Sequence, residues 1–150
     1  MKKRPLFRLV YNLIIISVII FIFSNSVLSV EQSSNASGRV LTLVNDILEK
    51  LNSPFLLSVV FVRKAAHFIE YFTLGALLAG DVILFKERSI KYFVYYTFAS
   101  CLVAMTDETI QYFTNRGSML LDVWLDLFAA ALAVLLVFVF NIKNTKKERC

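Results

Sequence analysis

Glycine, proline and cysteine are all scarce in this chain of 150 residues, which contains four, two and two of them respectively. So little glycine disfavours a transmembrane β-barrel. The two cysteines, Cys101 and Cys150, show no spacing typical of a metal or redox motif, and the topology below places them too far apart for a disulfide. Apolar residues dominate instead, at 58% of the chain with a mean hydropathy of +0.69, which is too apolar for an ordinary soluble domain. We therefore expect an all-α integral membrane protein.

Four hydrophobic stretches are long enough to cross a bilayer, whose apolar core of about 30 Å takes roughly 20 helical residues. They cover residues 6–30, 65–85, 92–113 and 119–140. Basic residues before the first stretch are also typical of a cleaved signal peptide, but its long apolar run without a clear Ala-x-Ala site favours an uncleaved helix. Small residues four apart, Gly75 with Ala79 and Ala129 with Ala133, predict close helix packing. The prediction is a single-domain, four-helix membrane bundle.

Basic residues in the short flanks predict the orientation, because positively charged segments are retained in the cytoplasm. They gather before the first span at residues 2–8, after the second span at residues 86–91 and in the tail at residues 141–150. We therefore expect a multi-pass protein of the cell membrane with both termini cytoplasmic. The formal net charge of +5 reflects these flanks beside anionic lipid, so membrane lipids are expected partners and nucleic acid is not.

The segment after the first span is polar and then amphipathic. Residues 29–38 are rich in serine and predict an external turn. Residues 40–51 have apolar side chains three and four apart with polar ones opposite, which predicts an amphipathic helix in the outer interface. This helix either covers the bundle or forms a lid over a pocket. Pro54 ends it, and residues 55–62 are an apolar approach to the second span.

Polar side chains gather at one end of the second, third and fourth spans, which is the external end on this topology. They are Arg63, Lys64, His67, Glu70, Tyr71, Asp107, Glu108, Gln111, Asp122 and Asp126. Within each span, spacings of three and four residues place them on one helix face. Charges inside a bilayer cost on the order of 3 kcal/mol each and commonly mark functional sites. The sequence therefore predicts one polar pocket in the outer leaflet.

The chemistry of this pocket is open to three interpretations. Its carboxylates and imidazole would suit a divalent cation, although their spacing matches no known metal signature. Alternatively, His67 and Glu70 act as general acid and base on a head group held by basic side chains. Those basic side chains are Arg63, Lys64 and Arg116. A third interpretation makes them structural ion-pair partners, but apolar side chains would stabilise a bundle equally well, which favours a functional cluster.

These interpretations define two sets of candidate residues. The candidates for catalysis are His67, Glu70, Asp107, Glu108 and Asp122. The candidates for ligand binding are Arg63, Lys64, His67, Tyr71, Gln111, Arg116 and Asp126. Whether the site is catalytic is left open at this point.

Two motifs carry a family resemblance: RKAAHFIEYFTLGALLAG at residues 63–80 and DETIQYFTNRGSMLLDVWLD at residues 107–126. With FSNS at residues 23–26, they resemble the VanZ-like family of small multispan bacterial membrane proteins. The likeness runs from about residue 21 to residue 136. It implies that the characteristic polar positions of the family are Lys64, His67, Tyr71, Asp107, Glu108, Gln111, Arg116 and Asp122. The family commonly has Asn where this chain has Asp126, and Gly where it has Ala129.

The resemblance implies a role in the cell envelope, because the founding member of the family is associated with resistance to the glycopeptide teicoplanin. Such drugs act on lipid-linked cell-wall precursors outside the membrane, which is compatible with an outward-facing pocket. The protein would then bind a lipid, a lipid-linked precursor or the drug, or it would be an enzyme that modifies a lipid or precursor. A transporter is disfavoured, because only Asp81 and Thr97 are polar deep on the cytoplasmic side.

Overall fold

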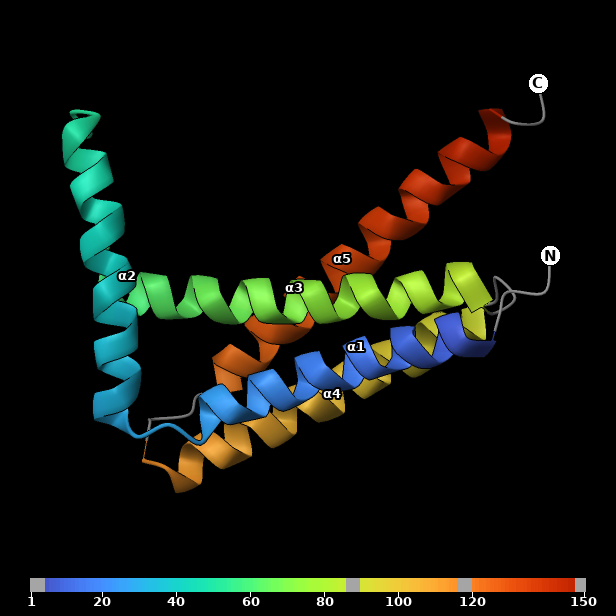
Figure 1. The fold of residues 1–150 in the computed structure, drawn as a ribbon, viewed down its shortest axis with the longest axis horizontal. Helices are drawn as coiled ribbons and strands as arrows, with labels where there is room; N and C mark the ends of the chain where they lie inside the picture. Colours follow the sequence, from blue (N-terminus) through green and yellow to red (C-terminus); the bar gives the residue numbers. More distant parts are fainter. Residues whose placement is uncertain (1–4, 86–89, 116–119, 148–150) are drawn as a thin grey trace.

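The computed structural model describes residues 5–85, 90–115 and 120–147, which form five α-helices and no strand. The helices are α1 (Pro5–Ser26), α2 (Val30–Lys50), α3 (Val59–Phe85), α4 (Ile90–Phe113) and α5 (Leu120–Lys147) (Figure 1). The all-α prediction is confirmed. The predicted basic residues at 2–4, 86 and 88, together with Arg116 and Cys150, lie outside the described residues.

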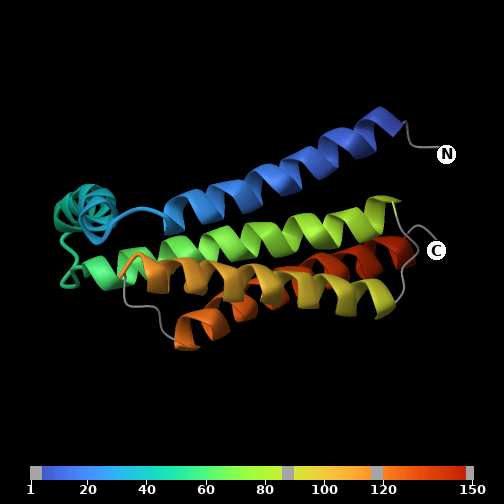
Figure 2. The same ribbon diagram turned by 90° about the horizontal axis from the view of Figure 1, so that it is seen from below.

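The third helix is the centre of the fold. α3 packs against each of the other four described helices, and α4 also contacts both α1 and α5. Figures 1 and 2 show α1, α3 and α4 running alongside one another, with α5 crossing α3 obliquely. The second helix lies across one end of this group (Figure 1). This end is where α1 and α4 finish and where α3 and α5 begin.

Three of the described helices are long and apolar enough to cross a membrane: Pro5–Ser26, Val59–Leu84 and Leu120–Phe140. They expose large apolar side chains such as Leu13 and Phe128, which lipid tails accept and water does not. The protein is therefore a multi-pass membrane protein. The predicted span at residues 92–113 corresponds to α4, a helix of 24 residues that is not among the three. Its tyrosines, Lys91 and the acidic pair Asp107 and Glu108 make α4 less apolar.

The second helix begins much earlier than predicted, and the expected turn at residues 29–38 is wrong. α2 starts at Val30 and ends at Lys50, so it contains most of the serine-rich segment as well as the amphipathic one. Ser29 caps this helix. The backbone amide of Gln32 donates to the Ser29 hydroxyl at 3.2 Å, and the backbone amide of Ser29 donates to the side-chain oxygen of Gln32 at 3.0 Å. This reciprocal capping box supplies partners for amide groups that a helix start leaves unpaired.

The predicted span limits differ from the helices mainly at one end. The span at 6–30 is too long, because α1 ends at Ser26, where the chain turns into the cap of α2. The span at 65–85 begins too late, since α3 starts at Val59 and takes in half of the predicted apolar approach. The span at 119–140 ends too early: α5 continues to Lys147 and so includes most of the predicted tail. Lysine is a good helix former, so the helix extends past the apolar region.

The core lies along α3, where Tyr71 and Leu74 meet apolar side chains from α1, α4 and α5. Gly75 lies against the α5 backbone, and a Cβ at this position would lie only 2.8 Å from the Cα of Ala130. Ala129, Ala130 and Ala133 are all buried on the facing side of α5. The close packing predicted from the small residues is confirmed, and it holds the first turns of α5 next to α3.

The replacement Gly75→Ala is expected to lower the free energy of unfolding by about 1–3 kcal/mol, because the added methyl overlaps the α5 backbone and pushes the helices apart. Gly38→Ala is the matched control: nothing lies within 4 Å of a Cβ at Gly38, and alanine is the better helix former by about 1 kcal/mol. Unfolding of the purified protein by SDS in mixed micelles measures both. A Gly75→Ala protein as stable as the original would contradict the packing described here.

Candidate functional site

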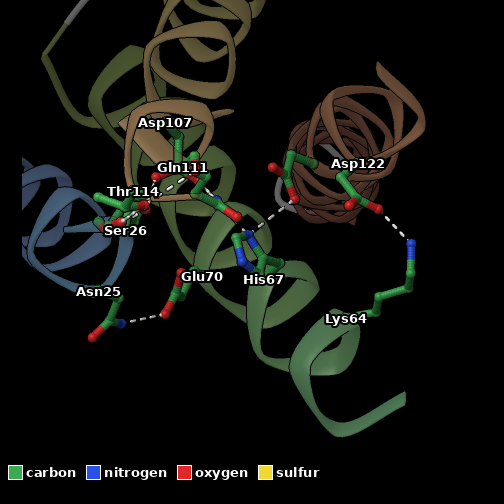
Figure 3. A network of polar contacts seen from close by, with 11 residues as sticks. Asn25, Ser26, Lys64, His67, Glu70, Asp107, Gln111, Thr114 and Asp122 are labelled. Atoms are coloured by element: carbon green, nitrogen blue, oxygen red, sulfur yellow. Dashed lines mark hydrogen bonds and ion pairs between the residues drawn. The ribbon is translucent and has the colours of Figure 1, made fainter. Parts of the chain in front are cut away.

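Four helices bring polar side chains to the end of the bundle that lies next to α2 (Figures 2 and 3). Ser26 ends α1, His67 lies near the start of α3, Asp107 lies near the end of α4, and Asp126 lies near the start of α5. Ser26, Asp107 and Asp126 are almost completely buried. The sequence predicted that α3, α4 and α5 contribute to one location, and the described residues do meet there.

His67, Asp107 and Asp126, here called the central cluster, lie at the middle of this polar region. The His67 Nδ1 atom is 3.7 Å from Asp107 Oδ2 and 3.7 Å from Asp126 Oδ1. The two carboxylates are fully buried, and the His67 side chain is 15% exposed. Figure 3 shows the His67 ring pointing between α4 and α5. One imidazole from α3 thus faces carboxylates from two other helices.

Hydrogen bonds from α1 and α4 hold Asp107 in place. The Ser26 hydroxyl donates to Asp107 Oδ1, and the Gln111 side-chain amide donates to Asp107 Oδ2 at 3.2 Å. The Thr114 hydroxyl lies 3.3 Å from the Ser26 carbonyl oxygen and so joins the ends of α4 and α1. With both oxygens bonded, the Asp107 carboxylate has a fixed orientation toward His67 (Figure 3).

The first helix contributes two residues that were not singled out as site candidates. Besides Ser26, the Asn25 side-chain amide donates to Glu70 Oε1 at 2.7 Å. Both residues are uncharged and lie at the end of α1, which contains no acidic residue, so charge patterning did not single them out. The available signal was the FSNS motif at residues 23–26, whose polar residues are out of place in an apolar span.

Lys64 and Asp122 form an ion pair at the edge of the polar region. Their side chains are 46% and 26% exposed, so solvent or lipid head groups reach both. This pair connects α3 to α5 beside the central cluster (Figure 3). Lys64 therefore behaves as the structural interpretation of the basic residues expects, as the ion-pair partner of an acidic side chain.

A cavity of about 360 Å³ lies between the end of α1, one face of α2 and the start of α3. Its walls are mainly apolar, with Val40 and Val44 of α2 facing α3. The polar side chains along it are Asn25, Ser33, Ser37, Arg63, His67 and Glu70. Because His67 lines this cavity, it is the central-cluster residue that a molecule in the cavity would meet.

A second hollow of about 560 Å³ lies between α4 and α5. Glu108 is its acidic lining residue, among apolar and aromatic side chains such as Met105, Tyr112 and Trp124. Glu108 is nevertheless only 6% exposed. Glu108, a predicted site residue of α4, thus also lines a hollow between α4 and α5.

The structure separates the predicted site residues into four groups. The first group is the central cluster of His67, Asp107 and Asp126, with Gln111 bonded to Asp107 and Tyr71 buried one turn from His67 on α3. Lys64 and Asp122 form the rim, Arg63 and Glu70 line the cavity between α1, α2 and α3, and Glu108 lines the hollow between α4 and α5. Arg116 lies outside the described residues. In the described chain, the central cluster is also the group of three side chains whose ligand atoms, all within 4.8 Å of one another, could hold a metal ion.

A family model described as VanZ/LLP1 matches residues 8–141, which is nearly the whole chain. No curated protein and no solved structure gave a match. The matched range includes all of the site residues described above.

Proposed function

This chain belongs to the VanZ/LLP1 family, and we propose that it protects the cell envelope against glycopeptide antibiotics of the teicoplanin type. In this proposal the protein binds a lipid or a lipid-linked cell-wall precursor in the polar end of the bundle and so limits the access of the drug. The whole of residues 1–150 forms one membrane domain, and the polar end faces outward.

The proposed topology has four spans, with both termini in the cytoplasm. α4 joins α1, α3 and α5 as a span because it lies alongside α1 and α3 in both views (Figures 1 and 2). Its acidic residues Asp107 and Glu108 are buried among the other helices, so a membrane would not meet their charges. The basic segments at residues 2–8, 86–91 and 141–150 favour placing the other end of the bundle inside. α2 then lies in the outer interface.

The observation that carries the proposal is the cavity between α1, α2 and α3. It combines apolar walls with a short row of polar side chains, a combination that suits an amphiphile with an apolar chain and a polar head. Arg63 supplies a guanidinium, the group best suited to a head-group phosphate or carboxylate. Asn25, Glu70 and His67 add donors and acceptors beside it. A membrane lipid or lipid-linked precursor has this chemistry.

An enzyme that modifies a lipid or precursor is the second candidate, and one observation favours it. His67 faces two buried carboxylates and lines the same cavity as Glu70, which is an arrangement suited to moving protons. The conservative replacement Glu70→Gln separates the two functions, since it removes a proton acceptor but leaves a hydrogen-bonding side chain. An enzyme should lose nearly all tolerance with this change, whereas a binding site should lose only part of it.

The test of the proposed function is the glycopeptide and lipopeptide susceptibility of a host strain that expresses this protein. We expect the original chain to raise the inhibitory concentration and the His67→Ala, Glu108→Ala variant, at equal expression, to leave it unchanged. Asp46→Ala, Glu49→Ala is the matched control, because both residues are exposed on α2 away from the cavity. No effect of the original chain, or full tolerance with the His67 variant, would contradict the proposal.

A further inference from the structure

We propose that His67, Asp107 and Asp126 form a binding site for one divalent cation of the Mn²⁺ or Zn²⁺ class. This inference rests on the pocket assigned above and deepens the proposed function by naming an ion within that pocket. Four features of the three side chains carry it: their spacing, their unmet bonding capacity, their support and their access to the cavity.

The spacing of the ligand atoms fits a cation better than it fits direct hydrogen bonds. His67 Nδ1 lies 3.7 Å from an oxygen of each carboxylate, which is too long for a hydrogen bond. Metal bonds of about 2.1 Å place neighbouring ligand atoms of a tetrahedral site about 3.4 Å apart. All three ligand atoms lie within 4.8 Å of one another, so one ion between them reaches each with small movements.

Buried polar atoms in the cluster lack partners among the described groups. Both carboxylate oxygens of Asp126 and the Nδ1 of His67 are buried without a hydrogen bond. Buried polar groups are nearly always satisfied, and a fully buried carboxylate is especially unfavourable without a partner. A cation at the centre supplies the partner that Asp126 and His67 lack.

The charge balance and the surroundings of the cluster support the same ion. Two buried carboxylates face one imidazole, so a doubly charged cation with a neutral imidazole ligand would neutralise the group. Asp107 receives hydrogen bonds from Ser26 and Gln111, as ligating carboxylates commonly do. These bonds come from two different helices and orient the carboxylate toward the ion.

The types of ligand atom indicate the class of cation, and the cavity gives a bound molecule access to it. An imidazole nitrogen with carboxylate oxygens suits Zn²⁺ and Mn²⁺, whereas Ca²⁺ prefers oxygen ligands alone. Three protein ligands leave at least one coordination position open. Because His67 lines the cavity between α1, α2 and α3, that position is available to an oxygen of the bound lipid component.

The test is Mn²⁺ binding to the purified full chain, prepared without a histidine tag and followed by electron paramagnetic resonance. We expect one Mn²⁺ per chain, with a nitrogen coupling from one imidazole. The chain has a single histidine, so this coupling identifies His67 even if every variant fails to fold. His67→Gln should remove the coupling, and Asp126→Asn should weaken binding by on the order of 10- to 100-fold or more.

Asp81→Asn is the matched control, because Asp81 is a buried carboxylate further along the same helix as His67 and contacts Tyr96 rather than the cluster. This variant should bind Mn²⁺ as the original chain does. No bound Mn²⁺ or Zn²⁺ in the folded original protein, or binding without nitrogen coupling, would overturn the cation site. Tolerance in cells that depends on Asp126 without any bound metal would overturn the cation site and leave the proposed function. Metal binding by a chain that gives no tolerance would overturn the proposed function and leave the cation site.

Discussion

The replacement His67→Leu is expected to abolish antibiotic tolerance and to lower the free energy of unfolding by about 3 kcal/mol. Leucine removes the one imidazole that faces Asp107 and Asp126, which are fully buried. Two buried carboxylates would then lie together without the imidazole that faces them. Removing one partner of a buried charged group is strongly destabilising for this reason.

The triple variant His67→Leu, Asp107→Asn, Asp126→Asn is expected to regain most of this stability and still to give no tolerance. Asparagine has nearly the shape of aspartate but no charge. Its one side-chain oxygen can still accept from the Ser26 hydroxyl, and its NH2 group can donate to the Gln111 side-chain oxygen once the Gln111 amide turns over. Replacing a whole buried charged group is often neutral or stabilising. The comparison therefore separates a cluster retained for function from one retained for stability.

SDS unfolding in the presence of a chelator, together with susceptibility of the expressing strain, measures both effects. The chelator keeps the carboxylates free of cations, so the unfolding energies refer to the same state in each variant. The account would be contradicted by a stable triple variant that keeps full tolerance. It would also be contradicted by a triple variant less stable than His67→Leu, because the cluster would then stabilise the fold.

Ser37→Trp is expected to remove tolerance without loss of stability. Ser37 lies on the face of α2 that lines the cavity, so an indole at this position occupies the space proposed for the lipid component. Ser34→Trp is the control: Ser34 is exposed on α2 and does not line the cavity. The two variants add the same side chain to α2, one at a position that lines the cavity and one at a position that does not.

Susceptibility at equal expression measures the effect of these two tryptophans. We expect strains with Ser34→Trp to behave like those with the original chain and strains with Ser37→Trp to behave like the empty host. Equal tolerance from both variants would show that the cavity is not where the component binds. Loss of tolerance from both would assign the effect to α2 itself rather than to the cavity.

The helical class of this protein and the end at which its charges gather were predictable from the sequence. Apolar stretches of about 20 residues indicate membrane helices regardless of how they pack. The position of a charged residue within such a stretch gives its depth. Counting residues along each stretch therefore predicts that His67 and Asp107 lie at the same end of the bundle. The family motifs include both residues.

The roles of neighbouring charged residues were not predictable, because they depend on which helix each side chain faces. Arg63 and Lys64 are adjacent but point about 100° apart around the helix. One lines the cavity beside α1 and α2, and the other pairs with Asp122 of α5. Asp122 and Asp126 share a helix face, yet only Asp126 reaches the central cluster.

The sequence predicted a turn where α2 begins, because its serine-rich composition was given more weight than the capping pattern within it. Serine-rich segments favour turns, so residues 29–38 suggested one. The four residues that begin at Ser29 also contain the serine and glutamine of a capping box, which starts a helix when both side chains bond back to the chain. The site contribution of α1 was missed because Asn25 and Ser26 carry no charge.

The most direct test of the account is the side from which the cavity can be reached. Ala66 lines the cavity, so Ala66→Cys in a chain without Cys101 and Cys150 places one thiol there. We expect a membrane-impermeant maleimide to label this thiol in intact cells, and to label Cys150, as the single cysteine, only after permeabilisation. A protected thiol in the Ala66→Cys chain, beside a reactive Cys150 in intact cells, would place the polar pocket inside the cell and contradict the account.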